Sequence, residues 1–295
     1  CIGDANAEFK AEASAAADPR DKAPDNAQPT HLQIIPAEVV GQPDTEVVFR
    51  ANLFDGKGRL IGPAQPEWAF AGAAGHLDGA TLTMTAQGGG KVTASLGDLN
   101  AETRVAVLPA AQFEEDFERF AANASPVWVA VGSKFKVREV DGNKLLVKPP
   151  AARGLHRANT YLGPPTMAGY TIQADLLGKK KRRAVPDMGL ISHRYTLDMM
   201  GYHQQLQIRT WAAELRMAKT VPFAWETGVW YTAKMTVAIE GDKAIVRGKI
   251  WPRDEPEPAT WSIEAEDPLP NLAGSPGLYG YSPAEIFYDN IKVWQ

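Results

Sequence analysis

Cysteine is nearly absent from the 295-residue chain, and so are several other features that would point to a function. The single Cys1 permits no intrachain disulfide, no cysteine-rich zinc site and no CxxC redox pair. No run of about 18 apolar residues occurs, so the sequence predicts no transmembrane helix. The formal net charge of −4 at pH 7 is atypical of a dedicated nucleic-acid-binding protein, which is usually basic. We therefore expect no nucleic-acid partner.

Recognisable catalytic motifs are also missing. No GxSxG, HExxH or phosphate-loop pattern occurs, and the five histidines lack metal-ligand spacing. The sequence thus predicts a protein that is not an enzyme and needs no cofactor. A polysaccharide hydrolase or lyase is the open alternative, and it would require Asp175, Asp198 or Glu214 to meet in a cleft.

The one cysteine is residue 1, and a chain that begins with Cys rather than Met resembles a processed bacterial lipoprotein. This resemblance implies that Cys1 is lipidated and that the membrane is a partner. It further implies a cell-envelope location, facing the periplasm or in the outer membrane, because Ile2 follows the cysteine. The alternative is a chain boundary that has nothing to do with processing.

Residues 1–29 are rich in Ala, Asp, Glu and Pro, and Ile2 and Phe9 are their only large apolar side chains. Such a segment cannot bury enough surface to offset its ordering entropy, so we expect a flexible tether. The alternative is that part of it becomes ordered on a partner.

Residues 30–110 alternate short apolar runs with turns such as Asp55-Gly56-Lys57-Gly58, which is typical of an antiparallel sandwich. With "GQPDTEVVFRANLFDGKGRLI", a central Trp68, "GHLDGATLTMTA" and "ETRVAVLP", this stretch resembles bacterial immunoglobulin-like modules. The resemblance implies an Ig-like β-sandwich without catalytic residues.

Residues 111–295 show almost no helical periodicity and many candidate strands, which predicts a two-sheet jelly roll. Gly241-Asp242 between two long strands indicates a hairpin. The expected strands are Lys134–Val140, Lys144–Val147, Thr171–Leu177, Met188–Met199, Gln204–Trp211, Trp230–Glu240, Lys243–Trp251, Thr260–Ala265 and Ile286–Val293.

This half resembles the concanavalin-A-like superfamily in its laminin-G-like branch, through "EDFERF", "GVWYTAKMTVAIEGDKAIVRGKIWP" and "IFYDNIKVW". Both halves together resemble the C-terminal region of exported bacterial proteins with PQQ-type β-propellers, through "PDMG", "RYTL" and "QQL". The propeller itself is missing from the chain. Glucanases of the superfamily carry an ExDxxE strand, whereas the nearest cluster here, Glu264-Ala265-Glu266-Asp267, has the wrong spacing and is expected to be a solvated turn.

Three of the expected strands alternate apolar residues with amides, charges and tryptophan, so each presents a polar face. Such a face suits a sugar, which stacks on indole and bonds to polar side chains. An ordinary solvated sheet and a protein-docking face are the alternatives. The candidate ligand-binding residues are Gln173, Asp175, Gln205, Gln207, Arg209, Trp211, Arg247, Lys249 and Trp251.

Five consecutive cations, Lys179, Lys180, Lys181, Arg182 and Arg183, cannot be buried and are expected to form a loop. The loop is either a solvated hairpin or an attachment point for an anionic surface.

In many jelly-roll carbohydrate modules the first and last strands share a calcium ion. By this resemblance Asp116, Glu118 and Asp289 are candidate ligands for a structural calcium, and the alternative is that Asp289 bonds backbone groups.

The sequence as a whole favours an exported, lipid-anchored, non-catalytic binding protein whose jelly roll binds a glycan or another cell-envelope component. The alternative is an accessory subunit of a larger membrane or periplasmic protein complex.

Overall fold

The structure is a computed structural model that describes residues 22–109, 112–152, 154–211 and 215–295. The chain divides into two compact units with the main boundary between Val105 and Ala106. The fold class expected from the sequence is confirmed, because both units are built from β-strands and the described residues contain no α-helix. No helix in this part of the chain is long and apolar enough to span a membrane. Cys1 lies outside the described residues.

The first ten strands form an immunoglobulin-like sandwich of three sheets, ordered β1-β4-β5, β2-β10-β9-β6 and β3-β8-β7. Its core contains Leu32, Leu82 and Val92, which alternate with exposed or half-buried neighbours. The strands are β1 (Pro29–Ile35), β2 (Glu38–Gly41), β3 (Glu46–Val48), β4 (Arg50–Asp55), β5 (Leu60–Ala64), β6 (Glu67–Gly72), β7 (Gly75–Asp78), β8 (Thr81–Met84), β9 (Gly88–Leu96) and β10 (Leu99–Val107).

The segment just before β1 is not free, although the sequence places it in the tether. Lys22 forms a parallel bridge with Leu60, and the Ala23 amide donates to the Leu60 carbonyl over 2.9 Å. These backbone bonds hold residues 22–23 against β5, so the expectation of a flexible tether as far as residue 29 is wrong for this end of it.

The larger sheet of the second unit has the order β12-β13-β24-β15-β20-β21-β22, and β11 also pairs with β24. Its strands are β11 (Phe113–Glu115), β12 (Lys136–Val140), β13 (Asn143–Lys148), β15 (Thr171–Gly178), β20 (Tyr231–Glu240), β21 (Lys243–Pro252), β22 (Ile263–Asp267) and β24 (Ile286–Trp294). A short 3₁₀ turn, η2 (Gly132–Lys134), precedes β12.

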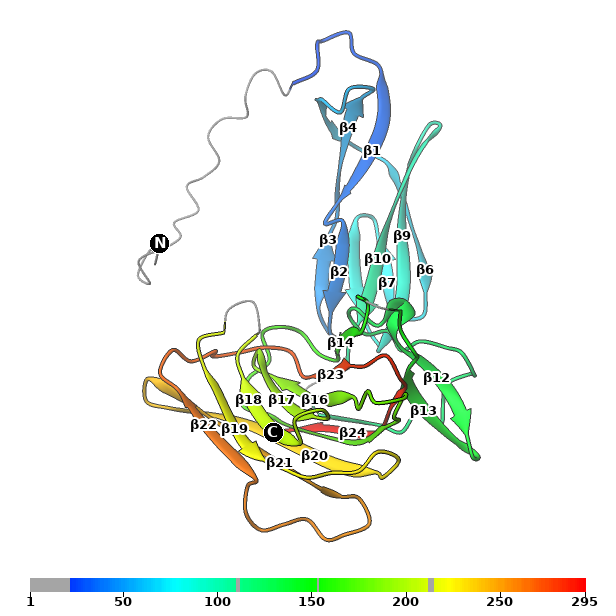
Figure 1. Ribbon diagram of the computed structural model, residues 1–295. Helices are drawn as coiled ribbons and strands as arrows, with labels where there is room; N and C mark the ends of the chain where they lie inside the picture. The colour runs from blue at the N-terminus through cyan, green and yellow to red at the C-terminus, as the bar shows by residue number, and fades with distance from the viewer. Residues whose placement is uncertain (1–21, 110–111, 153, 212–214) are drawn as a thin grey trace. The chain divides into compact units, whose positions relative to one another are not determined.

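The second sheet has six strands in the order β14-β23-β16-β17-β18-β19. They are β14 (Arg157–Tyr161), β16 (Asp187–Ser192), β17 (Tyr195–Met200), β18 (Gln205–Arg209), β19 (Ala218–Pro222) and β23 (Gly277–Tyr281). Figure 1 shows β16, β17 and β18 in one layer and β20, β21 and β22 in the other. The single core of this unit lies between the two layers.

Close approach of the two layers depends on Gly248 in β21. A Cβ atom there would lie 2.6 Å from Cδ1 of Leu197, which is completely buried on the opposite sheet. The apolar sides of β17 and β21 therefore interlock at this point, and their polar sides face outwards.

Every strand range expected from the sequence overlaps a strand, but the range Met188–Met199 is wrong as a single strand. It forms the hairpin β16–β17, with Ser192 paired to Tyr195 across a two-residue turn. The turn residues His193 and Arg194 have φ of 49° and 65°, the left-handed conformation that such turns require. In the second unit, strands β11, β14, β19 and β23 have no counterpart among the expected ranges.

Candidate functional site

The outer face of the six-stranded sheet carries a continuous array of polar and aromatic residues. Leu197 and Ile208 point into the core, so the residues that alternate with them point outwards. The strand register sets two rows across this face. One row is Asn159, Tyr279, Gly189, Asp198 and Gln207, and the next is Tyr161, Gly277, Ile191, Thr196 and Arg209.

A cavity of about 630 Å³ lies at one end of this face. Its walls include the exposed Trp211, the turn residue Arg194 and the guanidinium of Arg216. Trp211 is 54% exposed, although large apolar side chains are usually buried. The remaining lining residues are Asn159, Tyr161, Pro165, Ile191, Thr196, Asn271, Ala273, Gly274 and Ser275.

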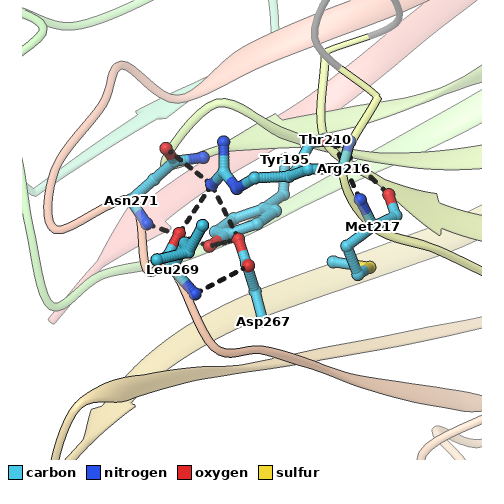
Figure 2. Close-up of polar contacts among 7 residues, drawn as sticks. All are labelled: Tyr195, Thr210, Arg216, Met217, Asp267, Leu269 and Asn271. Carbon is cyan, nitrogen blue, oxygen red and sulfur yellow. Dashed lines mark hydrogen bonds and ion pairs between the residues drawn. The ribbon is translucent and has the colours of Figure 1, made fainter. Parts of the chain in front are cut away.

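Arg216 is held in place by Asp267, which is fully buried at the end of β22 (Figure 2). Arg216 Nη2 donates to Asp267 Oδ2 over 2.7 Å and to the Leu269 carbonyl over 2.7 Å. Tyr195 also donates to Asp267 Oδ2 over 2.7 Å, and its hydroxyl accepts from the Asn271 amide. Burial would raise the pKa of Asp267, but the bonds from Arg216 and Tyr195 outweigh it and keep the pKa below its ordinary value. The site thus contains a fixed ion pair beneath its wall.

The base of the loop that carries Trp211 and Arg216 is closed by Thr210 and Met217. The Thr210 amide donates to the Met217 carbonyl over 3.0 Å, and Thr210 Oγ1 accepts from the Arg216 amide over 3.1 Å (Figure 2). These contacts fix where the two cavity residues leave the sheet.

The turn that carries Arg194 is supported from behind by aromatic stacking. The His193 ring stacks on Tyr170 with the ring centres 4.8 Å apart, and Tyr170 donates to the Gly274 carbonyl over 2.7 Å. Burial lowers the pKa of His193 to about 4, so the ring is neutral at pH 7. A Cβ on Gly274 would lie 2.8 Å from His193 Cα, so only glycine lets the loop 271–275 pack so closely on the turn.

A buried ion pair lies beside the cavity. Asp198 Oδ2 accepts from Arg209 Nη2 over 2.9 Å, and the Arg209 guanidinium lies 5.1 Å from the centre of the Tyr279 ring. Burial, with a contribution from Asp187, raises the pKa of Asp198 to about 7 despite the Arg209 charge. Asp198 Oδ1 has no hydrogen-bond partner within the described residues.

Four of the predicted ligand-binding residues share this face. Gln205, Gln207 and Arg209 point outwards from β18, and Trp211 follows the strand and lines the cavity. Gln207 donates to Thr220 Oγ1 over 3.0 Å, and Arg209 pairs with Asp198, so Trp211 is the member of this group that reaches the cavity.

The other five predicted binding residues lie on the opposite sheet, so the nine do not form one surface. Gln173 and Asp175 belong to β15, and Arg247, Lys249 and Trp251 to β21. The cause is strand order, since β15 and β21 flank β20 in the larger sheet and β18 belongs to the smaller one.

Most of this second group bonds to neighbours within the protein. Asp175 accepts from Thr232 over 2.6 Å and from Asn290 over 2.9 Å. Lys249 pairs with Glu257 at 2.6 Å, and Arg247 Nε with Glu264 at 2.6 Å. Their polar groups thus support the sheet itself. Because Asp175 and Asp198 lie on different sheets, the two cannot meet in one cleft, and Glu214 lies outside the described residues.

The carboxylates expected to hold calcium do not converge. The first and last strands are adjacent as expected, with Glu115 opposite Ile291. Asp289, however, accepts from Asn143 and from the Asn290 amide, and Glu118 accepts from the Lys144 amide. Asp116 accepts from the Glu118 amide, and the described residues contain no group of three His, Cys, Asp or Glu side chains that could hold a metal ion.

The basic segment forms an exposed loop between β15 and β16, as expected. Lys179 pairs with Glu285 at 3.4 Å and lies over the Phe287 ring. The cations Lys180, Lys181, Arg182 and Arg183 make no ion pair within the part of the chain that the structure describes.

Most of the cavity wall was not predicted from the sequence. Arg194 escaped notice because the turn that positions it was read as strand, and Arg216 because it lies in a loop without a motif. Thr196 could have been found, since it alternates with the apolar Tyr195 and Leu197 and faces Arg209 across the strands.

No protein-family model matches the chain, and no curated protein matches it. Among solved structures, the chain is similar to one of the endo-acting O-glycanases with which human gut microbiota initiate mucin breakdown. The identity is 12% and the TM-score 0.38, over 61% of this chain and 97% of that one. It is also similar to chicken galectin 2, with 15% identity and a TM-score of 0.28, over 46% of this chain and 97% of that one.

A third similar structure is a bifunctional GH43-CE protein of Bacteroides eggerthii, with 11% identity and a TM-score of 0.39. The match covers 88% of this chain but only 34% of that one. Similarity at this level identifies neither a family nor a ligand. The resemblance to propeller-carrying proteins stays a prediction.

Proposed function

We propose that the protein binds an oligosaccharide in the cavity at the end of the six-stranded sheet, without transforming it. The observation that carries this proposal is the exposed indole of Trp211 beside fixed polar groups in a concave site. A sugar ring places its C–H face on an aromatic ring and its hydroxyls toward hydrogen-bonding groups. Around the indole of Trp211, the side chains of Asn159, Thr196 and Arg216 offer both hydrogen-bond donors and acceptors for the sugar hydroxyls.

The cavity also has the properties of a preformed site. Its volume of about 630 Å³ falls within the usual range for small-ligand sites, roughly 300–1,000 Å³. Asp267 and Tyr195 hold Arg216 and the Asn271 loop before any ligand arrives. Preorganisation of this kind reduces the entropy lost on binding.

A glycan array with the full chain, followed by titration calorimetry on the best ligand, tests the proposal. Trp211→Ala is expected to weaken binding about 10-fold, or about 1.4 kcal/mol, because it removes the stacking surface. Tyr202→Ala is the matched control. Tyr202 is also an exposed aromatic residue, 81% against 54% for Trp211, and it lies beyond the opposite end of β17 and does not line the cavity. Equal losses in the two variants, or no glycan bound by folded protein, would refute the proposal, and turnover of a bound glycan would refute its non-catalytic part.

A second candidate function is that of an accessory subunit docked through the loop Lys179–Arg183. The specific observation is that its last four cations are exposed without ion-pair partners in the described part of the chain. Pull-down from native membranes tests it, with the Lys180→Gln/Arg182→Gln/Arg183→Gln variant beside the wild type. A stoichiometric complex that the variant loses supports docking, and a protein that elutes alone contradicts it.

A further inference from the structure

Arg194 is an exposed cation at the wall of the cavity. Its side chain is exposed and makes no hydrogen bond or ion pair within the described residues. Its backbone is nevertheless fixed, because Ser192 pairs with Tyr195 and the His193 ring stacks on Tyr170. The turn therefore fixes the backbone of Arg194 at the cavity rim, and its exposed guanidinium is available to a ligand.

The second cation of the wall, Arg216, is oriented by Asp267 but still has donors without a partner in the described residues. The bonds that Arg216 makes to Asp267, Leu269 and Asn271 all use Nη2. Its Nη1 and Nε atoms make no hydrogen bond within the described part of the chain. Figure 2 shows Nη1 directed away from these three acceptors. The charge of Asp267 offsets that of Arg216, while these two donors stay free for a ligand.

No acidic residue is among the described residues that line the cavity. Among the described residues, the ionised groups at the wall are thus one balanced pair, Arg216 with Asp267, and one cation without an ion-pair partner, Arg194. A planar guanidinium presents paired N–H donors that match carboxylate or sulfate oxygens, and charge-assisted bonds of this kind are stronger than neutral ones.

We propose that the cavity selects acidic saccharides, with a carboxylate or sulfate group bound by Arg194 and a sugar ring stacked on Trp211. This inference rests on the proposed function, because it names the class of glycan that the same site takes. The shared chemistry is an anionic oxygen group on a sugar, and uronic acids and sulfated sugars are its two sources.

Matched pairs of glycans test the inference on the full chain. The probes are oligogalacturonate with its methyl ester, and a sulfated galactan oligosaccharide with its desulfated form, each measured by titration calorimetry. In at least one pair, the Kd of the acidic member is expected to be at least about 10-fold lower than the Kd of its neutral partner. The pair that shows the preference tells which source the site prefers. The preference should shrink when salt is raised, since exposed charges are screened.

Arg194→Gln should abolish the preference, and an unchanged thermal unfolding transition shows that the variant is folded. Arg194→Lys retains the charge and should keep part of the preference. Arg182→Gln, in the basic loop outside the cavity, is the matched control and should change nothing.

The outcomes separate this inference from the function it rests on. Equal binding of acidic and neutral partners, with Trp211→Ala still weakening both, overturns the acidic preference and leaves oligosaccharide binding in place. If Arg182→Gln lost the preference as much as Arg194→Gln, the inference would also be overturned. The preference would then come from general attraction between the positive surface and the acidic glycan, and not from the cavity. No binding of any glycan overturns both.

Discussion

Asp198 is a buried carboxyl group on the outer face of the six-stranded sheet, where Thr196 and Tyr279 are buried as well. It is 2% exposed, and its Oδ1 atom has no hydrogen-bond partner within the described residues. Arg209 neutralises the other oxygen at 2.9 Å but does not offset the loss of hydration, so burial raises the pKa to about 7. A polar residue at an alternating position is readily predicted from the sequence to face outwards, but its degree of burial is not, because Tyr279 and Arg209 cover it from other strands.

The raised pKa of Asp198 predicts how stability changes with pH. Between about pH 4 and pH 7 the unfolded chain loses the proton of Asp198 and the folded protein keeps it, so wild-type stability falls as pH rises. Relative to Asp198→Asn, the free energy of unfolding should therefore fall by at most about 1.4 kcal/mol per pH unit in this range and level off above it. Urea denaturation of both proteins from pH 4 to pH 8 measures the difference. A difference that is constant with pH would show that Asp198 titrates near its ordinary pKa, and Asp254→Asn, at an exposed position, is the control.

At the scale of the element, the hairpins show how far local sequence determines structure. The hairpin β20–β21 was predictable, because Gly241 adopts φ of 67° at the turn and apolar residues alternate on both strands. The hairpin β16–β17 was not, since His193 and Arg194 replace the usual Asn-Gly signal. Stacking of His193 on Tyr170, a contact distant in sequence, supports their left-handed backbone. Arg194, which lines the cavity from this turn, was not predicted because the turn depends on that distant contact.

Strand β23 was missed for a different tertiary reason. Its sequence Gly277-Leu278-Tyr279-Gly280-Tyr281 suggests a break, because glycine is disfavoured in strands. A Cβ on Gly280 would lie 2.7 Å from the hydroxyl of Tyr288, and one on Gly277 would lie 2.6 Å from the Thr160 carbonyl. Both glycines are required by close neighbours that only the folded sheet brings together.

The loop 271–275 and the β16–β17 turn are expected to act as one unit. Gly274→Ala should force them apart, because the added Cβ would meet backbone atoms of His193 and Arg194 at 2.8–2.9 Å. We expect a loss of about 1–3 kcal/mol in the free energy of unfolding, together with weaker glycan binding, since both walls of the cavity move. Thermal denaturation and calorimetry measure the two effects. Gly56→Ala is the control, because its added Cβ would meet only Thr30, at 3.8 Å, and an unchanged Gly274→Ala protein would refute the coupling.

At the scale of the whole molecule, the sequence predicted the classes of fold but not which polar strands share a sheet. Alternation showed that Gln205, Arg209, Arg247 and Lys249 face outwards. It could not show that β18 and β21 lie in opposite sheets, because strand order depends on pairings between residues far apart in the chain. Any site built from several strands shares this difficulty.

Seven of the eight tryptophans belong to the second unit, and Trp68 is the one in the first. Each unit also buries its own apolar cluster, with Leu197 fully buried in the second and Leu82 in the first. Tryptophan fluorescence should therefore report mainly the unfolding of the jelly roll. We expect Leu197→Ala to destabilise the fluorescence-detected transition by about 2–5 kcal/mol, because it removes buried methyl groups and leaves a cavity.

Leu82→Ala should leave that same transition nearly unchanged, because the deleted methyl groups belong to the other core. Its effect should appear instead in hydrogen exchange of β8 and of its partners β3 and β7, which share its sheet. Guanidinium denaturation followed by fluorescence, with exchange measured on the same samples, distinguishes the two variants. If both substitutions lowered the fluorescence transition by the same amount, the two cores would unfold as one cooperative unit, and ligand binding in the jelly roll would then stabilise the immunoglobulin-like sandwich as well.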